Sequence, residues 1–463
     1  MLGAVRDHAR ARGQGGRPLR ALAVAASLAV VVPLLAALFS SARAGAGATA
    51  LRNADAQAAG RELRLADVRL APRAQGPALA PPAARLALRP PARAAIVVDA
   101  RDGSPLFAFH ADRRLPIASA TKLMTALIAR ERLPLDRTLP AVSYRAAPAE
   151  SVLGLAPGER MKVRDLLAAT LLQSANDAAA TLAVAVAGSQ RRFVALMNRR
   201  ARALGLRHTR FGNPIGLDAP GAGSTARELA QLARAVLRDR FLARVVAMPQ
   251  AVLASGARRR IVRNRNDLVR RYPWVEGVKT GHTAGAGYVL VSAARGALGQ
   301  RVVAVVLGAP NERLRDEHSL ALLRFALARF QRLAVLDPRR PRAVAAEASA
   351  RALVAPARAL SLVLRRDQRA RVVLRVERPL RGPLPRAARV GRFAVLVDGR
   401  PVAAVPAVLS RPLASTGTFA SLSRRLGSGL TLLVLAAMLT LAVAALRATR
   451  PRRAPRPGVD TGR

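Results

Sequence analysis

Residues 116–125 read Pro-Ile-Ala-Ser-Ala-Thr-Lys-Leu-Met-Thr, and the interpretation of the whole chain starts from this stretch. Ser119 and Lys122 lie three positions apart within residues 118–131, whose apolar spacing predicts a helix. Because positions i and i+3 share one face of a helix, we expect the two side chains to touch. A serine hydroxyl is a weak nucleophile until a base takes its proton, and a buried lysine can lose its own proton and act as that base. The stretch therefore predicts an activated serine near the start of a helix.

Lysine is scarce in this chain. Of the 77 Lys and Arg residues, only Lys122, Lys162 and Lys279 are lysines. Arginine stays protonated in proteins and cannot act as a base, so each lysine raises the question of why arginine did not serve there. Lys279 begins the triplet Lys279-Thr280-Gly281 on an expected strand, where Lys279 and Thr280 can bind a substrate carboxylate and Gly281 lets substrate approach the backbone. We expect Lys162 to be a solvated surface residue.

A third short motif, Ser174-Ala175-Asn176, lies between the other two. The patterns S-x-x-K, S-D-N and K-T-G are typical of penicillin-binding proteins and class A β-lactamases, and here the middle pattern has Ala in place of Asp. Each motif alone allows a structural interpretation, since Ser119 could be a helix N-cap and Ser174 an ordinary turn residue. Their order, with two of the three lysines in the motifs that require lysine, favours a catalytic site.

The segments around these motifs resemble the low-molecular-mass D-alanyl-D-alanine carboxypeptidases of the penicillin-binding-protein superfamily, over roughly residues 94–332. The segments that carry the resemblance are 116–125, 173–178, 211–217, 224–230 and 277–283. The resemblance implies an α/β, β-lactamase/DD-peptidase-like catalytic domain. Such a domain has an antiparallel sheet flanked by helices and an all-helical cluster that carries Ser174.

The resemblance also implies catalytic roles. Ser119 would be the acylated nucleophile, Lys122 its base, and Ser174 would relay a proton toward the leaving D-alanine. The oxyanion hole would consist of the backbone N–H groups of Ser119 and His282. Whether the imidazole of His282 takes part is left open.

Substrate binding follows from the same resemblance. Asn176 would hold the substrate peptide, and Lys279 and Thr280, with Gly281 beside them, would bind its terminal carboxylate. The substrate implied is a peptidoglycan stem peptide that ends in D-Ala-D-Ala, and β-lactams are implied as covalent inhibitors. No cofactor is expected.

Three other functions remain open: a β-lactamase or a DD-endopeptidase on the same fold, and a non-catalytic envelope protein that binds wall polymer. A β-lactamase needs a second carboxylate that activates water. Between Asn176 and Lys279 no Glu is followed a few residues later by Asn in a loop, and Glu228 lies in a helical pattern. The sequence therefore favours a peptidase over a β-lactamase.

Composition excludes several classes of function. The formal charge is +50, but the arginines are spread along the whole chain and aromatic residues make up only 3%, so nucleic acid is not an expected partner. The chain has no cysteine, which excludes disulfides and thiolate metal sites. Its five histidines lack the spacing of metal ligands, so no metal is expected.

Both ends of the chain suggest a membrane. An Arg-rich start, an apolar run over 21–39 and the triplet Ala42-Arg43-Ala44 indicate a secretory signal or an N-terminal anchor. A second apolar run over 426–446 has the length of a bilayer span, and the arginines that follow it predict a cytoplasmic tail. We therefore expect a protein of the cell membrane whose catalytic domain lies outside the cytoplasm.

The expected segments are a signal peptide or anchor over 1–44, an Ala/Arg/Pro-rich linker over 45–93, the catalytic domain over 94–338, a small all-β domain over 339–412, a linker over 413–425, a transmembrane helix over 426–446 and a basic cytoplasmic tail over 447–463. Strands are expected at 94–99, 286–293, 301–307, 360–364, 372–376, 393–397 and 402–408, and helices at 118–131, 163–187, 190–204, 225–239 and 314–332. Asp102-Gly103 and Asp398-Gly399 predict hairpin turns.

Overall fold

The computed structural model describes residues 62–63, 91–346, 350–376, 380–414 and 433–445. The chain divides into two compact units, each considered separately below. The α/β unit consists of the described residues within Arg69–Val335 together with Leu360–Arg369. The β unit contains the strands within Leu336–Ala359 and from Ala370 onward, with a short strand at Glu62–Leu63.

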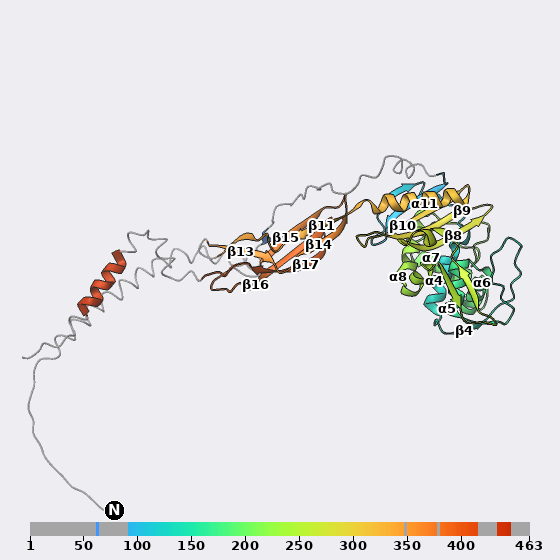
Figure 1. Ribbon diagram of the computed structural model, residues 1–463, viewed down its shortest axis with the longest axis horizontal. Helices are drawn as coiled ribbons and strands as arrows, with labels where there is room; N and C mark the ends of the chain where they lie inside the picture. Colours follow the sequence, from blue (N-terminus) through green and yellow to red (C-terminus); the bar gives the residue numbers. More distant parts are fainter. Residues whose placement is uncertain (1–61, 64–90, 347–349, 377–379, 415–432, 446–463) are drawn as a thin grey trace, which may run out of the picture. The chain divides into compact units, whose positions relative to one another are not determined.

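A five-stranded antiparallel sheet forms the centre of the α/β unit, with the strand order β3-β2-β10-β9-β8 (Figure 1). Its strands are β2 (Ala94–Asp99), β3 (Pro105–Phe109), β8 (Val275–Thr283), β9 (Gly287–Arg295) and β10 (Arg301–Ala309). The expected strands at 94–99, 286–293 and 301–307 and the turn at Asp102-Gly103 are confirmed. Strand β8, which carries the Lys-Thr-Gly triplet, is an edge of the sheet.

Helices cover both faces of this sheet. In β2, Ile96 packs into the core cluster shared with Leu123 and Leu229, whereas its neighbour Val97 packs into the opposite cluster with Leu322. This alternation is the period of a strand that is buried on both faces. The helices are α4 (Lys122–Arg132), α5 (Val163–Ala168), α6 (Asn176–Ala187), α7 (Gln190–Ala203), α8 (Ala226–Arg238), α9 (Arg240–Val246), α10 (Asp267–Arg271) and α11 (Glu312–Leu327).

Three two-stranded sheets complete the α/β unit: β4 (Thr138–Pro140) with β5 (Arg160–Lys162), β6 (Gln250–Leu253) with β7 (Arg260–Arg263), and β11 (Phe330–Leu336) with β14 (Leu360–Arg365). The sequence predicted one helix over 314–332. The end of this prediction is wrong, because α11 ends at Leu327 and residues 330–336 form β11. The expected strand at 360–364 exists as β14, but it pairs with β11 and is not part of the sheet of the β unit. Strand β14 belongs to the α/β unit because its hydrogen-bonded partner is β11.

The β unit is a six-stranded sheet with the order β1-β15-β16-β17-β13-β12. Its strands are β1 (Glu62–Leu63), β12 (Arg342–Ala345), β13 (Arg351–Pro356), β15 (Ala370–Val376), β16 (Arg389–Val397) and β17 (Arg400–Leu409). Asp398 and Gly399 join β16 to β17 with φ angles of 49° and 80°. Two successive residues with positive φ are the requirement of a two-residue hairpin turn, so this predicted hairpin is confirmed.

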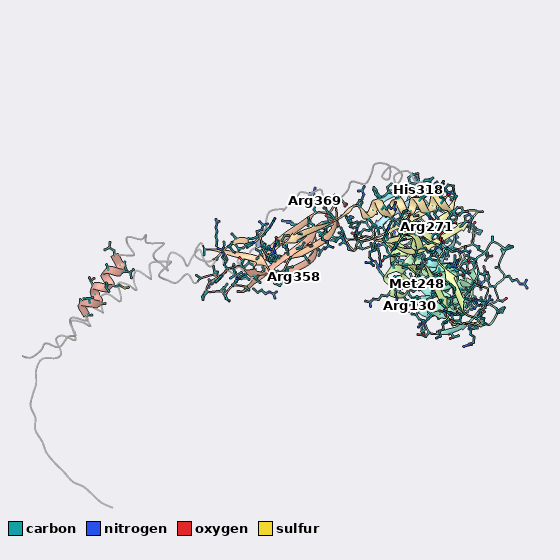
Figure 2. The ribbon with its side chains drawn as sticks, in the orientation of Figure 1. Arg130, Met248, Arg271, His318, Arg358 and Arg369 are labelled. Carbon is teal, nitrogen blue, oxygen red and sulfur yellow. The ribbon has the colours of Figure 1, made fainter. Side chains whose placement is uncertain are left out.

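Arginine side chains are spread over both units. Figure 2 labels Arg130 and Arg271 on helices of the α/β unit and Arg358 in the β unit. This distribution agrees with the arginine pattern of the sequence.

The predicted signal peptide at 1–44, nearly all of the linker at 45–93 and the tail at 447–463 lie outside the described residues. Of the predicted span at 426–446, residues 433–445 are described, and they are helical. Among the described residues, no helix combines the length and the apolar character needed to cross a membrane.

Candidate active site

Ser119 lies in a 3₁₀ turn, Ala118–Thr121, that leads directly into α4. The turn is packed tightly against the segment that contains Gly216, whose φ is +91°. A Cβ atom at Gly216 would lie 2.2 Å from the carbonyl oxygen of Ala118, so only glycine fits there. The expected contact between the two catalytic candidates is present, because Lys122 Nζ lies 2.9 Å from Ser119 Oγ.

Lys122 is fully buried and has a second partner, the carbonyl oxygen of Ile215, at 2.5 Å. Burial lowers the pKa of Lys122 to about 7, because the charged ammonium loses its hydration. The negative charges of Glu150 and Asp177 raise this pKa, whereas the positive charge of Arg265 lowers it. Near neutral pH a large fraction of this amine is therefore unprotonated and can accept the proton of Ser119.

Ser174 breaks the helical pattern that the sequence shows over 163–187. Helix α5 ends in a π-helical turn, Ala169–Gln173, and Ser174 then adopts a left-handed conformation with φ of +65° before α6 begins at Asn176. A non-glycine residue in this conformation is strained, and such strain is common at functional sites. Ser174 and Asn176 are both buried, and the backbone N–H of Asn176 donates to the carbonyl oxygen of Ser151 at 2.7 Å.

The side-chain amide of Asn176 has a partner that the sequence analysis missed. Asn176 Nδ2 donates to Glu150 Oε2 at 2.7 Å, and Glu150 also accepts from the hydroxyl of Tyr144 and, at 3.2 Å, from the backbone N–H of Ala147. The sequence analysis looked for a second carboxylate only between Asn176 and Lys279. A search that also covered the residues before Ser174 would have included Glu150.

Strand β8 brings the third motif against the nucleophile. A Cβ atom at Gly281 would lie 2.9 Å from the backbone nitrogen of Ser119, so glycine at this position permits the close approach. Lys279 is 1% exposed, and its Nζ donates to the carbonyl oxygen of Thr280 at 2.9 Å. The side chain of Thr280 is also buried.

Positive charge converges at this site. Burial lowers the pKa of Lys279 well below its usual value, and the charges of Lys122, Arg265 and Arg315 lower it further. Arg315, on α11, is 2% exposed and pairs with Glu312 at 2.7 Å and Asp316 at 2.8 Å. The sequence analysis missed Arg265 and Arg315, because no local pattern distinguishes them among 74 arginines. A site with this field favours an anionic group such as a carboxylate.

His282 is exposed at the end of β8, and its ring packs against that of Tyr288 with 4.2 Å between centroids. A cavity of about 230 Å³ lies beside the nucleophile turn and is lined by residues such as Ala118, Thr121 and Gly216. None of the eight predicted site residues lines this cavity. The candidate site is therefore the junction of the nucleophile turn, the Ser174 turn and β8.

A family model for D-alanyl-D-alanine carboxypeptidase matches residues 83–311. The D-alanyl-D-alanine carboxypeptidase DacD of Salmonella typhimurium is 33% identical over 275 residues, which cover 56% of this chain and 70% of that protein. The chain belongs to the D-alanyl-D-alanine carboxypeptidase family. DacC of Escherichia coli is 38% identical to this family member over 264 residues, or 53% of the chain. The match spans 64% of DacC, a little under two thirds of its length.

Solved structures of family members share the fold. The D-alanyl-D-alanine carboxypeptidase DacD from Francisella tularensis is similar with a TM-score of 0.52 and 25% identity, over 74% of this chain and 97% of that one. Penicillin binding protein 5 from Haemophilus influenzae has a TM-score of 0.51 and 24% identity, over 73% of this chain and 100% of its own. This family member therefore has the α/β fold of penicillin-binding DD-peptidases, with antiparallel sheets and helices.

Proposed function

We propose that this chain is a serine-type D-Ala-D-Ala carboxypeptidase that removes the terminal D-alanine of peptidoglycan stem peptides through an acyl-enzyme on Ser119. One observation carries the proposal. The amine of Lys122 is fully buried, lies 2.9 Å from Ser119 Oγ and has a pKa lowered to about 7. This is the arrangement that a lysine base and a serine nucleophile require. Membership of the carboxypeptidase family supports the same reaction.

Acylation begins when Lys122 takes the proton of Ser119. The serine oxygen attacks the carbonyl carbon between the two D-alanines, and the backbone N–H groups of Ser119 and His282 stabilise the oxyanion. The C–N bond then breaks, and Ser174 passes a proton to the departing amine. D-Alanine leaves, and the rest of the peptide stays on Ser119 as an ester.

Deacylation reverses the roles with water in place of D-alanine. Water attacks the ester carbonyl, the bond to Ser119 Oγ breaks, and the serine regains a proton. A β-lactam acylates Ser119 in the same way, but its leaving nitrogen stays tethered after ring opening. We therefore expect a long-lived penicillin adduct.

The substrate is held by its terminal carboxylate and by its peptide groups. Lys279 and Thr280 bind the carboxylate, and Asn176 binds the peptide. The positive charges of Arg265 and Arg315 near Lys279 support this assignment, because they favour an anion at the same place.

The test is covalent labelling of the full chain with a fluorescent penicillin, followed by mass spectrometry of the labelled peptide. We expect the label on Ser119 and none in Ser119→Ala, with both proteins equally folded. Ser361→Ala is a matched control, because Ser361 is exposed on β14, outside the site. Labelling that persists in Ser119→Ala, or that maps to Ser174, contradicts the assignment.

The alternatives are separated with the same preparations. A β-lactamase turns over many equivalents of penicillin, whereas the proposed enzyme is acylated once and stays labelled. A DD-endopeptidase cleaves cross-linked peptide dimers, whereas a carboxypeptidase releases D-alanine from uncross-linked pentapeptide. A wall-binding protein without catalysis takes no label at all.

We further propose that the α/β unit is the catalytic domain, that it acts outside the cytoplasm, and that residues 426–446 anchor the chain in the cell membrane. The apolar composition of 426–446 and the arginines that follow support the anchor. Fractionation of cells that express the full chain or a variant ending at residue 414 tests it. We expect the full chain in the membrane fraction and the shorter one outside it; equal distribution contradicts the anchor.

A further inference from the structure

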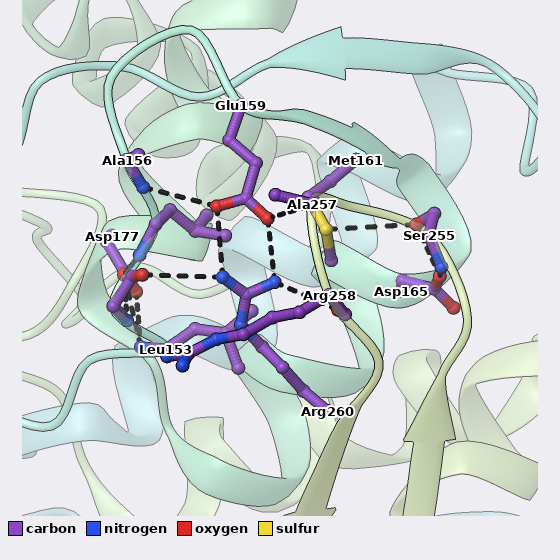
Figure 3. A network of polar contacts seen from close by, with 12 residues as sticks. Leu153, Ala156, Glu159, Met161, Asp165, Asp177, Ser255, Ala257, Arg258 and Arg260 are labelled. Carbon is purple, nitrogen blue, oxygen red and sulfur yellow. Dashed lines mark hydrogen bonds and ion pairs between the residues drawn. The ribbon is translucent and has the colours of Figure 1, made fainter.

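The loop that joins β4 to β5 is fixed to the body of the α/β unit at two points (Figure 3). The carboxylate of Asp177, on α6, accepts from the backbone N–H groups of Leu153 at 2.9 Å and Leu155 at 3.0 Å. Glu159 forms a two-bond ion pair with Arg260, at 2.7 and 3.0 Å, with both side chains buried. A loop held in this way presents its other side chains in defined positions.

Glu150 is the carboxylate that this loop brings to the candidate site. A carboxylate only accepts hydrogen bonds, so the amide group that faces it in Asn176 must be the NH₂ group. The contact therefore selects one of the two orientations of the amide and leaves Oδ1 of Asn176 to accept from another donor. The hydroxyl of Tyr144 and the backbone N–H of Ala147 hold the carboxylate in place.

Glu150 also acts on Lys122 through its charge. Burial alone would raise the pKa of Glu150, but hydrogen bonds from Tyr144, Asn176 and Ala147 and the charge of Lys122 keep it below its usual value. The residue is therefore an anion throughout the neutral range. In return, Glu150 is the strongest charge that raises the pKa of Lys122 against the effect of burial.

Other charges surround the same ammonium. Asp177 acts in the same direction as Glu150, whereas Arg265 acts in the opposite direction. Glu150 is thus one of two acidic groups that offset burial and the charge of Arg265 around Lys122. Its carboxylate already accepts from three donors and has a low pKa, which argues against a role as the base that activates water.

We propose that Glu150 is a positioning residue for the reaction proposed above: it fixes the orientation of the Asn176 amide and places a permanent negative charge within electrostatic reach of Lys122. The proposal rests on the proposed function for its purpose. Of its two physical elements, one hydrogen bond and one charge, the charge can be measured without any reaction.

The scarcity of lysine makes the charge element directly measurable. The full chain contains three lysines, so labelling with ε-¹³C-lysine gives three NMR signals, which Lys122→Arg and Lys162→Arg assign. Lys162 is exposed and serves as an internal reference. In Glu150→Gln, which keeps the shape but loses the charge, we expect the titration midpoint of Lys122 to fall by about one pH unit. Glu131→Gln, the same change at an exposed position of α4, should leave it unchanged.

The acylation rate should follow the same shift. Lys122 must be unprotonated to act, so the rate of penicillin acylation in the parent falls as the pH drops below about 7. In Glu150→Gln this acid limb should move to lower pH, and in Glu150→Asp, which keeps the charge, it should stay near that of the parent. An unchanged Lys122 midpoint in a folded Glu150→Gln, or an equal shift in Glu131→Gln, overturns the charge element.

The hydrogen-bond element is tested by a double-mutant cycle with Asn176→Ala. If Glu150 acts through Asn176, the effects of Glu150→Ala, which removes the acceptor, and Asn176→Ala on the KM for a D-Ala-D-Ala peptide are not additive. Additive effects overturn this element. If Glu150→Gln does not fold, Glu150→Ala, which also removes the charge, takes its place in the titration. A parent that takes no penicillin label contradicts the proposed function, whereas the NMR titration still gives a result for Glu150.

Discussion

At the scale of single residues, the two buried lysines of the site differ in what they contact. Both Nζ atoms contact a backbone carbonyl oxygen, but Lys122 Nζ also lies against the Ser119 hydroxyl, which must lose a proton. Arg265 lowers the pKa of both lysines, whereas the charges of Glu150 and Asp177 raise the pKa of Lys122. These environments suit a base at Lys122, whereas at Lys279 burial and three cations lower the pKa, so an anionic substrate would supply the counter-charge that favours its charged form.

Substituting each lysine by arginine separates the two roles. Lys122→Arg should be inactive, because arginine cannot lose its proton and is bulkier. Lys279→Arg keeps a cation for the carboxylate, and the loss of one charged hydrogen bond of about 1.5–3 kcal/mol corresponds to roughly ten- to a hundredfold in rate. Acylation by penicillin and by a D-Ala-D-Ala peptide measures both variants.

If Lys279→Arg is as inactive as Lys122→Arg on both substrates, Lys279 has a stricter role than carboxylate binding. Acylation of Lys122→Arg within about tenfold of the parent would show that Lys122 is not the base.

At the scale of secondary-structure elements, the site depends on how closely β8 approaches the turn Ala118–Thr121. Gly281 is buried, and a Cβ atom there would lie 2.9 Å from a backbone nitrogen and 3.0 Å from the Cβ of Ala118. Neither neighbour is the flexible end of a long side chain, so the elements themselves would have to separate.

Gly281→Ala should therefore impair catalysis more than folding. Strain of this kind costs about 1–3 kcal/mol, and the separation of β8 from Ser119 displaces the expected oxyanion donors. We expect the acylation rate to fall by one or two orders of magnitude while the far-UV CD spectrum is retained. An acylation rate equal to that of the parent would mean that β8 tolerates the movement.

The loop over 141–159, which joins β4 to β5, is a second element, and the Glu159–Arg260 ion pair is one of its two attachments. Hydrogen bonds from Arg260 lower the pKa of Glu159 to about 2, from an ordinary value of 4.5, more than burial raises it. Glu159→Gln leaves the buried Arg260 without its counter-charge and should lower the free energy of unfolding by roughly 2–4 kcal/mol. Glu317→Gln is the matched control, because Glu317 forms an exposed ion pair with Arg313 on α11. This change should lower the free energy of unfolding by less than about 0.5 kcal/mol.

The sign of the pH dependence follows from the lowered pKa of Glu159. The stabilisation by the ion pair is fully present above pH 4.5, the unfolded value, and is lost as the pH falls toward about 2. Denaturant unfolding at a series of pH values should show that the difference in the free energy of unfolding between the parent and Glu159→Gln becomes smaller over that interval. A difference that does not change with pH would show that the ion pair does not cause it.

At the scale of the whole molecule, the chain leaves the α/β unit after β11 and returns to it for β14. The returning strand brings Arg365, whose guanidinium reaches the buried Asp99 at 3.4 Å and Asp102 at 3.2 Å. A boundary drawn at residue 338 would cut β11 from its partner strand. The α/β unit therefore depends on a segment that follows part of the β unit in the sequence.

Arg365→Ala should lower the stability of the α/β unit by about 1–3 kcal/mol, because it leaves the buried carboxylate of Asp99 without this cation. Arg366→Ala is the matched control, since Arg366 is exposed in the turn that directly follows β14. Thermal unfolding, monitored by the loss of penicillin labelling, reports on the α/β unit alone. Equal melting temperatures for the two variants would show that Arg365 on β14 does not stabilise the α/β unit.

What the sequence alone determined is local. The Ser119–Lys122 contact follows from a spacing of three residues, and the turn at Asp398-Gly399 follows from two residues that tolerate positive φ. The predicted strands match observed strands within about four residues, because periodic burial is visible in a short window of sequence, whereas short strands such as β4, β5, β6 and β7 were not predicted. The three motifs contain seven of the eight candidate residues, and the family resemblance added His282; the roles of all eight stay predictions.

What only the tertiary structure decided depends on contacts between distant segments. Glu150 meets Asn176 across 26 residues, and Arg365 meets Asp99 across 266. The break at Ser174 is held by packing that overrides a continuous helical pattern. Such contacts have no period in the sequence, because they depend on how loops fold back over the core and which charges burial brings together. For this reason the sequence found the nucleophile and its base, and the structure was needed to find the charges that set the pKa of that base.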